Sequence, residues 1–353
     1  MHAITCVGWS GKDNHLFLFL SRSLRCFLKI MYLCNEKAFY VKNDLSRGYS
    51  AGKKNHFMTK VNFRGLGVAL ITPFNDDGSI DWRALSGMID YQVSNGTNYI
   101  VALGTTAETP TLSKQEKGEV VRFIVEKVNG RIPVVMGMGG NNTAEVAGEM
   151  QSCDHTGVSA FLSVTPYYNK PTQEGLYRHF CTLSQASPLP IILYNVPGRT
   201  GVNMTAETTL RLARDCGNVV AIKEASGDLN QIKAIIEGAP EGFQVISGDD
   251  AVTTDVIAMG GVGVISVFGN AFPKEMAWLV KHALNGDAQH AREQMEDDFN
   301  ALFHLMFVDG NPSGVKCLLS QRGMVRNVVR LPLVPVSEKT ERRIREELAR
   351  LEK

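Results

Sequence analysis

The chain has 353 residues, of which 44% are hydrophobic and 21% charged, and its formal net charge is +1. These proportions are typical of a globular protein, and near-neutrality gives no electrostatic basis for nucleic-acid or membrane binding, so we expect neither partner. The seven cysteines include no CxxC pair and the eight histidines no HExxH pair. We therefore expect free thiols, a cytoplasmic location, and no metal or other cofactor.

Residues 1–57 differ in composition from the rest of the chain. They carry nine Lys or Arg against three Asp or Glu, a net charge of +6, whereas residues 58–353 have a net charge of −5. The apolar stretch in this segment is too short for a secretory signal, and the basic composition fits a transit peptide only in part. We expect a basic N-terminal extension that is disordered, or a start placed too far upstream, with Met58 opening the protein.

Eight short apolar runs follow, each with an amphipathic stretch after it. They occupy residues 67–73, 99–104, 133–139, 160–166, 190–196, 219–225, 244–250 and 263–269. Continuous apolar runs, as opposed to alternating ones, are typical of parallel strands that are covered on both faces. Eight such units predict an α/β fold, a (β/α)8 TIM barrel over residues 58–285. A doubly wound sheet is the alternative, but it usually stops at five or six strands.

Helix start signals lie between these runs. We expect helix caps at Asp81, Ser113 (with Glu116 in a capping box), Thr143 and Thr205, and a first helical residue at Pro273. Residues 286–353 contain no strand pattern and are expected to form an appended C-terminal helical region. The glycines of GGVGVIS (260–266) lie before and within the eighth run, the wrong end for phosphate binding, so they predict close packing.

Lys223 lies in the middle of the sixth run, VVAIKEA. As an ammonium buried on both faces of a strand it would cost on the order of several kcal/mol, unless it is paired or uncharged. Pairing with Glu224, or snorkelling of the ammonium from the strand end, is one solution. The other is a neutral amine, a nucleophile that can form a Schiff base with a carbonyl substrate. The strand by itself leaves both interpretations open.

Polar residues gather after the predicted strands, where barrel enzymes place their chemistry. They lie at or directly after the ends of the first, second, fourth, fifth and seventh runs: Thr72, Thr105, Thr106, Tyr167, Tyr168, Tyr194, Asn195, Arg199, Asp249 and Asp250. Loops need polar residues, so a single cluster would predict little. Several clusters that converge on one face predict an active site.

Five motifs in this order, GTTAET, VTPYYNKPTQEGLYRHF, LYNVPGRTG, IKEASGD and SGDD, resemble those of the dihydrodipicolinate synthase family. This family belongs to the pyruvate-dependent class I aldolases, and the resemblance covers about residues 60–350. It implies a lyase in which Lys223 forms a Schiff base with pyruvate. The enamine then attacks L-aspartate 4-semialdehyde to give 4-hydroxy-tetrahydrodipicolinate, in diaminopimelate and lysine biosynthesis.

The resemblance also implies roles in proton transfer. Tyr194 matches the family's proton-relay tyrosine, and the hydroxyls of Thr106 and Tyr168 match those that chain to it. A phenol is a poor base unless neighbouring donors stabilise its phenolate, which such a chain supplies. Tyr168 would reach in from a neighbouring subunit, so the resemblance implies a homodimer or, as in most family members, a homotetramer.

Substrate binding is implied for five residues. Thr105, with the adjacent Thr106, matches the residues that hold the pyruvyl carboxylate. Arg199 matches the residue that binds the carboxylate of the semialdehyde, which its planar fork can hold bidentately. Gly248 and Ile265 match positions whose backbone lines the pyruvate pocket.

The chain departs from the family pattern at two places. Ala107 stands where Gly is common, which requires a backbone conformation that a methyl group permits. The family's lysine-feedback site is matched by Asn141, Glu145 and Tyr167, but Lys114 and Lys117 stand where strongly inhibited members carry His. Since two ammonium groups repel a cationic effector, we expect weak or absent inhibition by lysine.

Two other functions are alternatives. An N-acetylneuraminate lyase or a 2-keto-3-deoxy sugar acid aldolase is the alternative enzyme, although GTT and PGRTG favour the synthase. A catalytically silent relative that serves as a scaffold would be expected to lack Lys223 or Tyr194, and both are present.

Overall fold

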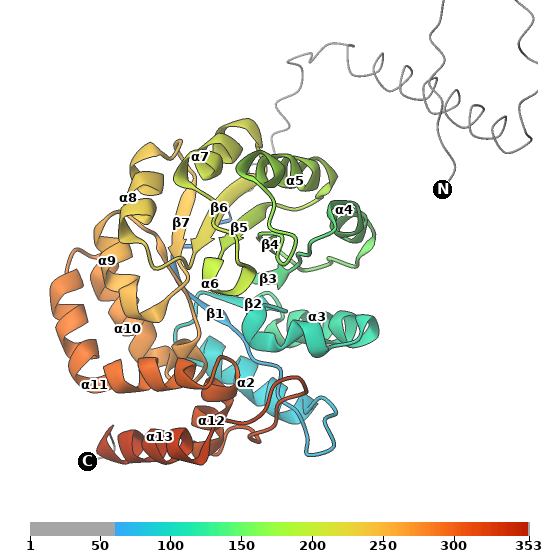
Figure 1. The fold of residues 1–353 in the computed structure, drawn as a ribbon. Coiled ribbons are helices and arrows are strands. Elements are labelled where there is room, and N and C mark those ends of the chain that lie inside the picture. Colours follow the sequence, from blue (N-terminus) through green and yellow to red (C-terminus); the bar gives the residue numbers. More distant parts are fainter. Residues whose placement is uncertain (1–60, 352–353) are drawn as a thin grey trace, which may run out of the picture. The chain divides into compact units, whose positions relative to one another are not determined.

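The computed structural model describes residues 61–351, apart from the side chains of residues 295–297. The expected extension over residues 1–57 lies outside the described residues. Eight parallel strands close into a barrel ringed by helices (Figure 1), as the sequence predicts. The strands are β1 Gly65–Ala69, β2 Tyr99–Ala102, β3 Val134–Gly137, β4 Ala160–Val164, β5 Ile191–Asn195, β6 Val219–Glu224, β7 Gln244–Ser247 and β8 Gly263–Ser266. Each pairs with the next along the chain, and β8 closes the barrel on β1.

Helices cover the outside of the barrel. They are α2 Trp82–Ser94, α3 Lys114–Val128, α4 Thr143–Ser152, α5 Gln173–Ala186, α7 Ala206–Asp215, α8 Leu229–Gly238, α9 Thr253–Ala258 and α10 Pro273–Leu284. Short turns follow four strands: η1 Thr105–Ala107, α6 Pro197–Thr200, η3 Asp250–Val252 and η4 Phe268–Asn270. Within residues 61–351, no helix combines the length and apolarity needed to cross a bilayer.

The helix start signals are confirmed with one correction. Asp81 and Thr205 cap α2 and α7, Ser113 and Glu116 form the expected capping box of α3, and α10 begins at Pro273. The expected cap at Thr143 is wrong by one residue. Asn142 is the cap, and its side chain accepts a hydrogen bond from the backbone N–H of Glu145.

Two apolar clusters form the core, one between the barrel and its helices and one inside the barrel. Tyr99 fills the interior against Phe63, with ring centroids 5.5 Å apart. The expectation of close packing around the glycines before β8 is confirmed: a Cβ on Gly263 would lie 2.0 Å from the carbonyl oxygen of Gly65. Glycine at this position lets β8 pair closely with β1.

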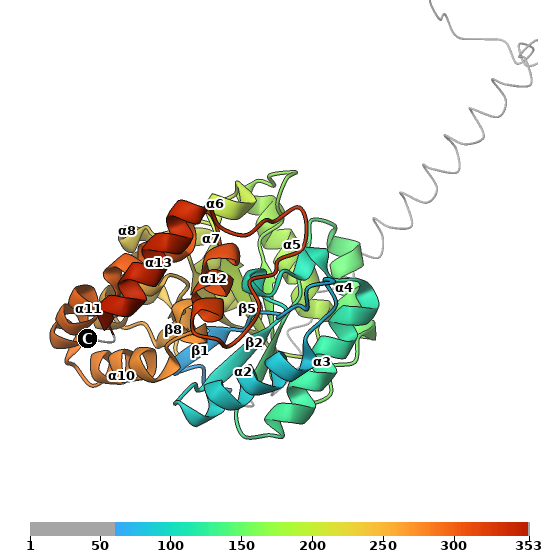
Figure 2. The same cartoon turned by 90° about the horizontal axis from the view of Figure 1, so that it is seen from below.

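Three helices form the expected C-terminal region: α11 Ala288–Val308, α12 Ser313–Gln321 and α13 Glu338–Leu351. They pack on one another beside α10, as Figures 1 and 2 show. Polar groups that are fully buried attach this region to the barrel. Lys316 of α12 pairs with Glu108, which ends the turn after β2, and donates to the carbonyl of Val328 at 2.9 Å.

Burial lowers the pKa of Lys316 to about 8, an effect that the carboxylate of Glu108 opposes. The second oxygen of Glu108 accepts from the backbone N–H of Arg330 at 2.9 Å. The ring of Phe74 lies 4.0 Å from the Lys316 ammonium and covers the pair from one side. The turn that carries Thr105 and Thr106 is therefore tied to the C-terminal region.

We expect Lys316→Met to lower the free energy of unfolding by about 3–5 kcal/mol, because it leaves the carboxylate of Glu108 buried without a counter-ion. The double variant Glu108→Gln/Lys316→Met removes both charges, while Gln keeps an acceptor for Arg330, so it should recover most of the loss. Urea unfolding of the two variants and the wild type measures this. A double variant less stable than Lys316→Met would contradict the expectation.

Candidate active site

Lys223 and Tyr194 face each other inside the barrel. They are register partners on the neighbouring strands β6 and β5. Ala221 belongs to the interior cluster and Ile222 to the outer one, so the alternation of side chains along a strand places Lys223 inside. Lys223 is 5% exposed, and its Nζ lies 4.5 Å from the centroid of the Tyr194 ring.

Glu224 points to the opposite face of β6 and does not pair with Lys223. Its carboxylate accepts hydrogen bonds from Asn195 at 3.0 Å, from the backbone of Ser226 at 2.8 Å and from Gln231 at 3.1 Å. Burial raises its pKa, and these hydrogen bonds act against that rise. Lys223 forms no ion pair with any residue that the structure describes, so of the two interpretations the paired lysine is wrong.

Space beside Lys223 is kept by a glycine at the end of β7. Gly248 donates its backbone N–H to the carbonyl of Glu224 at 2.7 Å. A Cβ on Gly248 would lie 2.6 Å from the Cβ of Ala225 and 3.1 Å from the Cε of Lys223. Ile265 of β8 is fully buried in the interior cluster.

The turn after β2 carries both threonines. Thr106 is 2% exposed, and its hydroxyl accepts a hydrogen bond from Asn311 Nδ2 at 3.0 Å. Within residues 61–351 no hydrogen bond joins Thr106 to Tyr194. Ala107 lies in an ordinary 3-10 turn, where a methyl group is permitted, and its carbonyl accepts from the Thr72 hydroxyl at 2.8 Å.

Arg199 lies in α6, directly after β5, and donates from Nη2 to the backbone carbonyl of Asn311 at 3.1 Å. Asn311 thus contacts two of the expected site residues. The sequence did not identify Asn311 as a site residue, because it lies in the predicted C-terminal helical region. An Asn before a Pro in that region does not by itself indicate a site.

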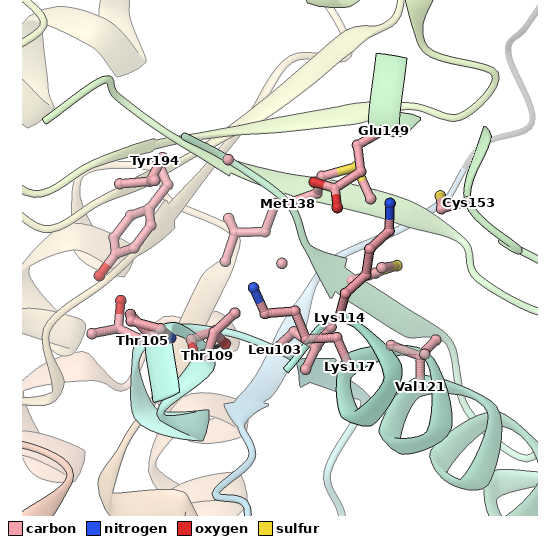
Figure 3. Close-up of a pocket in the computed structure, with 18 of the residues that line it drawn as sticks. Leu103, Thr105, Thr109, Lys114, Lys117, Val121, Met138, Glu149, Cys153 and Tyr194 are labelled. Atoms are coloured by element: carbon pink, nitrogen blue, oxygen red, sulfur yellow. Dashed lines mark hydrogen bonds between the residues drawn. The ribbon is translucent and has the colours of Figure 1, made fainter. Parts of the chain in front are cut away.

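A cavity of about 850 Å³ opens at this end of the barrel. Thr105, Tyr194 and Arg199 are among its lining residues, and the hydroxyl end of Tyr194 points toward Thr105 (Figure 3). The cavity continues outward between α3 and α4. There it is lined by apolar residues and by Lys114, Lys117, Glu149 and Cys153.

The expected effector residues lie beside this outer part. Tyr167 lines the cavity, and Asn141 donates to the backbone carbonyl of Tyr167 at 3.1 Å. Glu145 is exposed on the first turn of α4. In residues 61–351, no group of three or more His, Cys, Asp or Glu side chains could hold a metal ion.

Tyr168 is not brought to Tyr194 within the chain. It is 89% exposed and adopts φ 73°, and nearby Lys170 adopts φ 44°. Left-handed backbone at such residues costs on the order of 1–3 kcal/mol each and persists only where surrounding contacts impose it. Asn169 supplies one such contact, a hydrogen bond to the carbonyl of Asn141 at 3.1 Å. The loop thus holds an aromatic ring out toward solvent.

The chain is similar to known proteins over most of its length. Residues 62–351 match the family model described as "Dihydrodipicolinate synthetase family". The 4-hydroxy-tetrahydrodipicolinate synthase of Azobacteroides pseudotrichonymphae is 56% identical over 291 residues, which cover 82% of this chain and 98% of that relative. The crystal structure of dihydrodipicolinate synthase from Aquifex aeolicus has a TM-score of 0.79 and 41% identity, over 82% of this chain and 98% of its own.

A third similar protein was solved with a ligand. It is the chloride-inhibited dihydrodipicolinate synthase from Acinetobacter baumannii, complexed with pyruvate. Its TM-score is 0.79 and its identity 39%, over 82% of this chain and 99% of that one.

Asp250, the last residue of the SGDD motif at the end of β7, has a structural role. Asp250 is 6% exposed, and its Oδ2 accepts from the backbone N–H groups of Val267 at 3.0 Å and Phe268 at 2.9 Å. It thereby fixes the chain just after β8. Burial raises the pKa of Asp250 to about 6.

Because its pKa in the folded state exceeds the ordinary value of 3.8, Asp250 stabilises the fold at low pH, and this contribution is lost as pH rises through about 6. The uncharged variant Asp250→Asn lacks this dependence. The stability of the wild type relative to Asp250→Asn should therefore fall by on the order of 3 kcal/mol between pH 4 and 7. Urea unfolding across this range tests it, and parallel curves would contradict it.

Proposed function

Because the chain belongs to the dihydrodipicolinate synthetase family, we propose that Lys223 carries its reaction as the nucleophile that forms the Schiff base. The enzyme is a lyase with 4-hydroxy-tetrahydrodipicolinate synthase activity in lysine biosynthesis, and pyruvate is its substrate. The observation that carries the assignment to Lys223 is a buried amine that has no counter-ion among the described residues and lies 4.5 Å from a tyrosine ring.

The reaction follows from amine chemistry. The neutral amine of Lys223 attacks the keto carbon of pyruvate, and loss of water leaves an imine. When protonated, the imine accepts the electron pair released as a proton leaves the pyruvyl methyl group. The resulting enamine carbon attacks the aldehyde carbon of L-aspartate 4-semialdehyde. The amino group of that substrate then displaces Lys223 and closes the ring, so one water is lost overall.

Tyr194 is the proposed proton carrier because its ring lies beside Lys223 in a buried site. Thr106 and Tyr168 are its proposed hydroxyl partners. Since Tyr168 is exposed in its own chain, its place in the relay requires a second subunit whose site receives the ring. We therefore propose a homodimer as the smallest active form, with a homotetramer of two such dimers as the larger assembly.

Substrate positioning is proposed for five residues. Thr105 and Thr106 are proposed to hold the pyruvyl carboxylate, next to the backbone of Gly248 and Ile265. The guanidinium of Arg199 lines the cavity and is proposed to bind the carboxylate of the semialdehyde. The four described cysteines are free thiols, which suits the cytoplasmic location that we propose.

Replacing Lys223 with Ala should lower turnover by roughly 10⁴-fold or more, since no imine can form. Tyr194→Phe keeps the ring but removes the hydroxyl, and should lower kcat by roughly 10²–10⁴-fold. Turnover is assayed with pyruvate and either L-aspartate 4-semialdehyde or a sugar aldehyde. Borohydride reduction with pyruvate should trap an adduct on Lys223 in the wild type and in Tyr194→Phe. Turnover by Lys223→Ala, or faster consumption of the sugar aldehyde, would exclude the proposal.

The proposed effector site is formed by Asn141, Glu145 and Tyr167 beside the outer cavity, which Tyr167 lines. Lys114 and Lys117 lie on the first turn and a half of α3 and line this cavity. Because their charges repel a cationic effector, L-lysine should inhibit the wild type with a constant weaker than about 1 mM. The double variant Lys114→His/Lys117→His should be more sensitive to L-lysine at neutral pH. Tight inhibition of the wild type, or unchanged sensitivity of the variant, would refute this.

A further inference from the structure

Asn195 joins the two ends of the loop that carries Arg199. It is the last residue of β5, directly after Tyr194, and its side chain is fully buried. The loop leaves β5 at Val196 and returns at Met204, whose backbone N–H donates to Asn195 Oδ1 at 2.9 Å. Asn195 is not among the residues that line the cavity of the site. Its side chain closes the loop from behind.

The same amide attaches the end of this loop to β6. Asn195 Nδ2 donates to Asn203 Oδ1 at 2.8 Å and to the carboxylate of Glu224 at 3.0 Å. A primary amide has two N–H donors, so both are used, while Oδ1 accepts from Met204. Glu224 in turn accepts from two groups that follow β6. Two strands and the end of the loop therefore meet at one buried side chain.

Hydrogen bonds within the loop make its first turn stiff. The backbone N–H of Arg199 donates to the carbonyl of Val196 at 2.9 Å, and that of Gly201 donates to the carbonyl of Pro197 at 2.9 Å. Gly201 adopts φ 71°, which favours glycine, where the turn ends. The guanidinium of Arg199 is attached separately, to the backbone carbonyl of Asn311. Since the turn is bonded to itself, the contacts at the base of the loop determine where the backbone of Arg199 lies.

We propose that Asn195 is a positioning residue that fixes the loop of Arg199 and so sets the affinity of the site for the carboxylate of the second substrate. This inference rests on the proposed function, in which Arg199 binds the semialdehyde. A guanidinium holds a carboxylate bidentately in a specific geometry, so a small shift of the loop weakens the interaction. Pyruvate is bound to Lys223 on β6 before the semialdehyde reacts. Asn195 therefore acts on the second half of the reaction and leaves the first half unchanged.

The test is steady-state kinetics of full-length variants, with kcat/KM measured separately for pyruvate and for L-aspartate 4-semialdehyde. Asn195→Ala should lower kcat/KM for the semialdehyde roughly 10-fold, through KM. Its kcat, its kcat/KM for pyruvate and its yield of borohydride-trapped pyruvate should stay within about twofold of the wild type. Arg199→Ala should by itself lower kcat/KM for the semialdehyde roughly 10²-fold. In that background Asn195→Ala should have no further effect, because the group that it positions is gone.

Asn218→Ala is the matched control. Asn218 is also a partly buried asparagine, but it lies directly before β6, at the opposite end of the barrel from the site, and donates to the carbonyl of Ser184 at 2.9 Å. It should retain both wild-type kcat/KM values. Asn195→Asp keeps the shape and the acceptor for Met204 but sets a carboxylate against Glu224. It should also lower kcat/KM for the semialdehyde, and it decides the question if Asn195→Ala does not fold.

Three results overturn the proposal: an equal loss in kcat/KM for pyruvate, wild-type kinetics of the Asn195 variants, or a loss that persists in the Arg199→Ala background. Failure of both Asn195 variants to fold shows a purely structural role and overturns it as well. A wild-type kcat/KM of Arg199→Ala for the semialdehyde overturns instead the proposed binding role of Arg199. Absence of pyruvate trapping by the wild type overturns the proposed function itself.

Discussion

The central feature of the structure is an amine that is buried without a counter-ion among residues 61–351. Lys223 is 5% exposed, and the carboxylate that follows it in sequence is turned away and bound by three other groups. Burial of such a group costs free energy that the rest of the barrel has to offset. Gly248 keeps free volume at the Cε of Lys223, and Tyr194 places a phenol beside it. The barrel thus encloses the amine that we propose as the nucleophile.

The C-terminal region contacts the proposed site from outside the barrel. Glu108, at the end of the turn with Thr105 and Thr106, is held by Lys316 and by the backbone of Arg330. Asn311 adds a contact to Thr106 itself. Both contacts are buried and polar. Each therefore destabilises the fold when a hydrogen-bond partner is missing, and favours one arrangement of the turn when all partners are present. Helices with no strand of their own thereby set the geometry of a loop at the barrel mouth.

A single chain leaves the proposed relay incomplete. The loop of Tyr167–Lys170 is strained at two residues and extends the Tyr168 ring into solvent, although burial of an aromatic ring is favourable. Strain and exposure at one place are costly for an isolated chain, and they are offset if a second subunit receives the ring. The same loop, through Asn141 and Tyr167, borders the cavity that reaches the inner site. Assembly and effector binding would therefore act on one loop.

The sequence alone predicted the barrel, because short apolar runs that alternate with amphipathic stretches are typical of parallel strands covered by helices, and eight such units are the number of a TIM barrel. It also singled out Lys223, whose charge is out of place in such a run. The predicted runs extended past the observed strand ends because residues of the following loops, such as Leu70 and Ile71 after β1, are buried as well. Asn142 and Thr143 are both good caps, so propensity could not choose between them. Only the tertiary structure decided that Glu224 faces away from Lys223, that Lys316 pairs with Glu108, and that Asn311 contacts Thr106 from 205 residues away. Such contacts depend on how distant elements pack, and no local pattern of residues encodes the distance between two side chains.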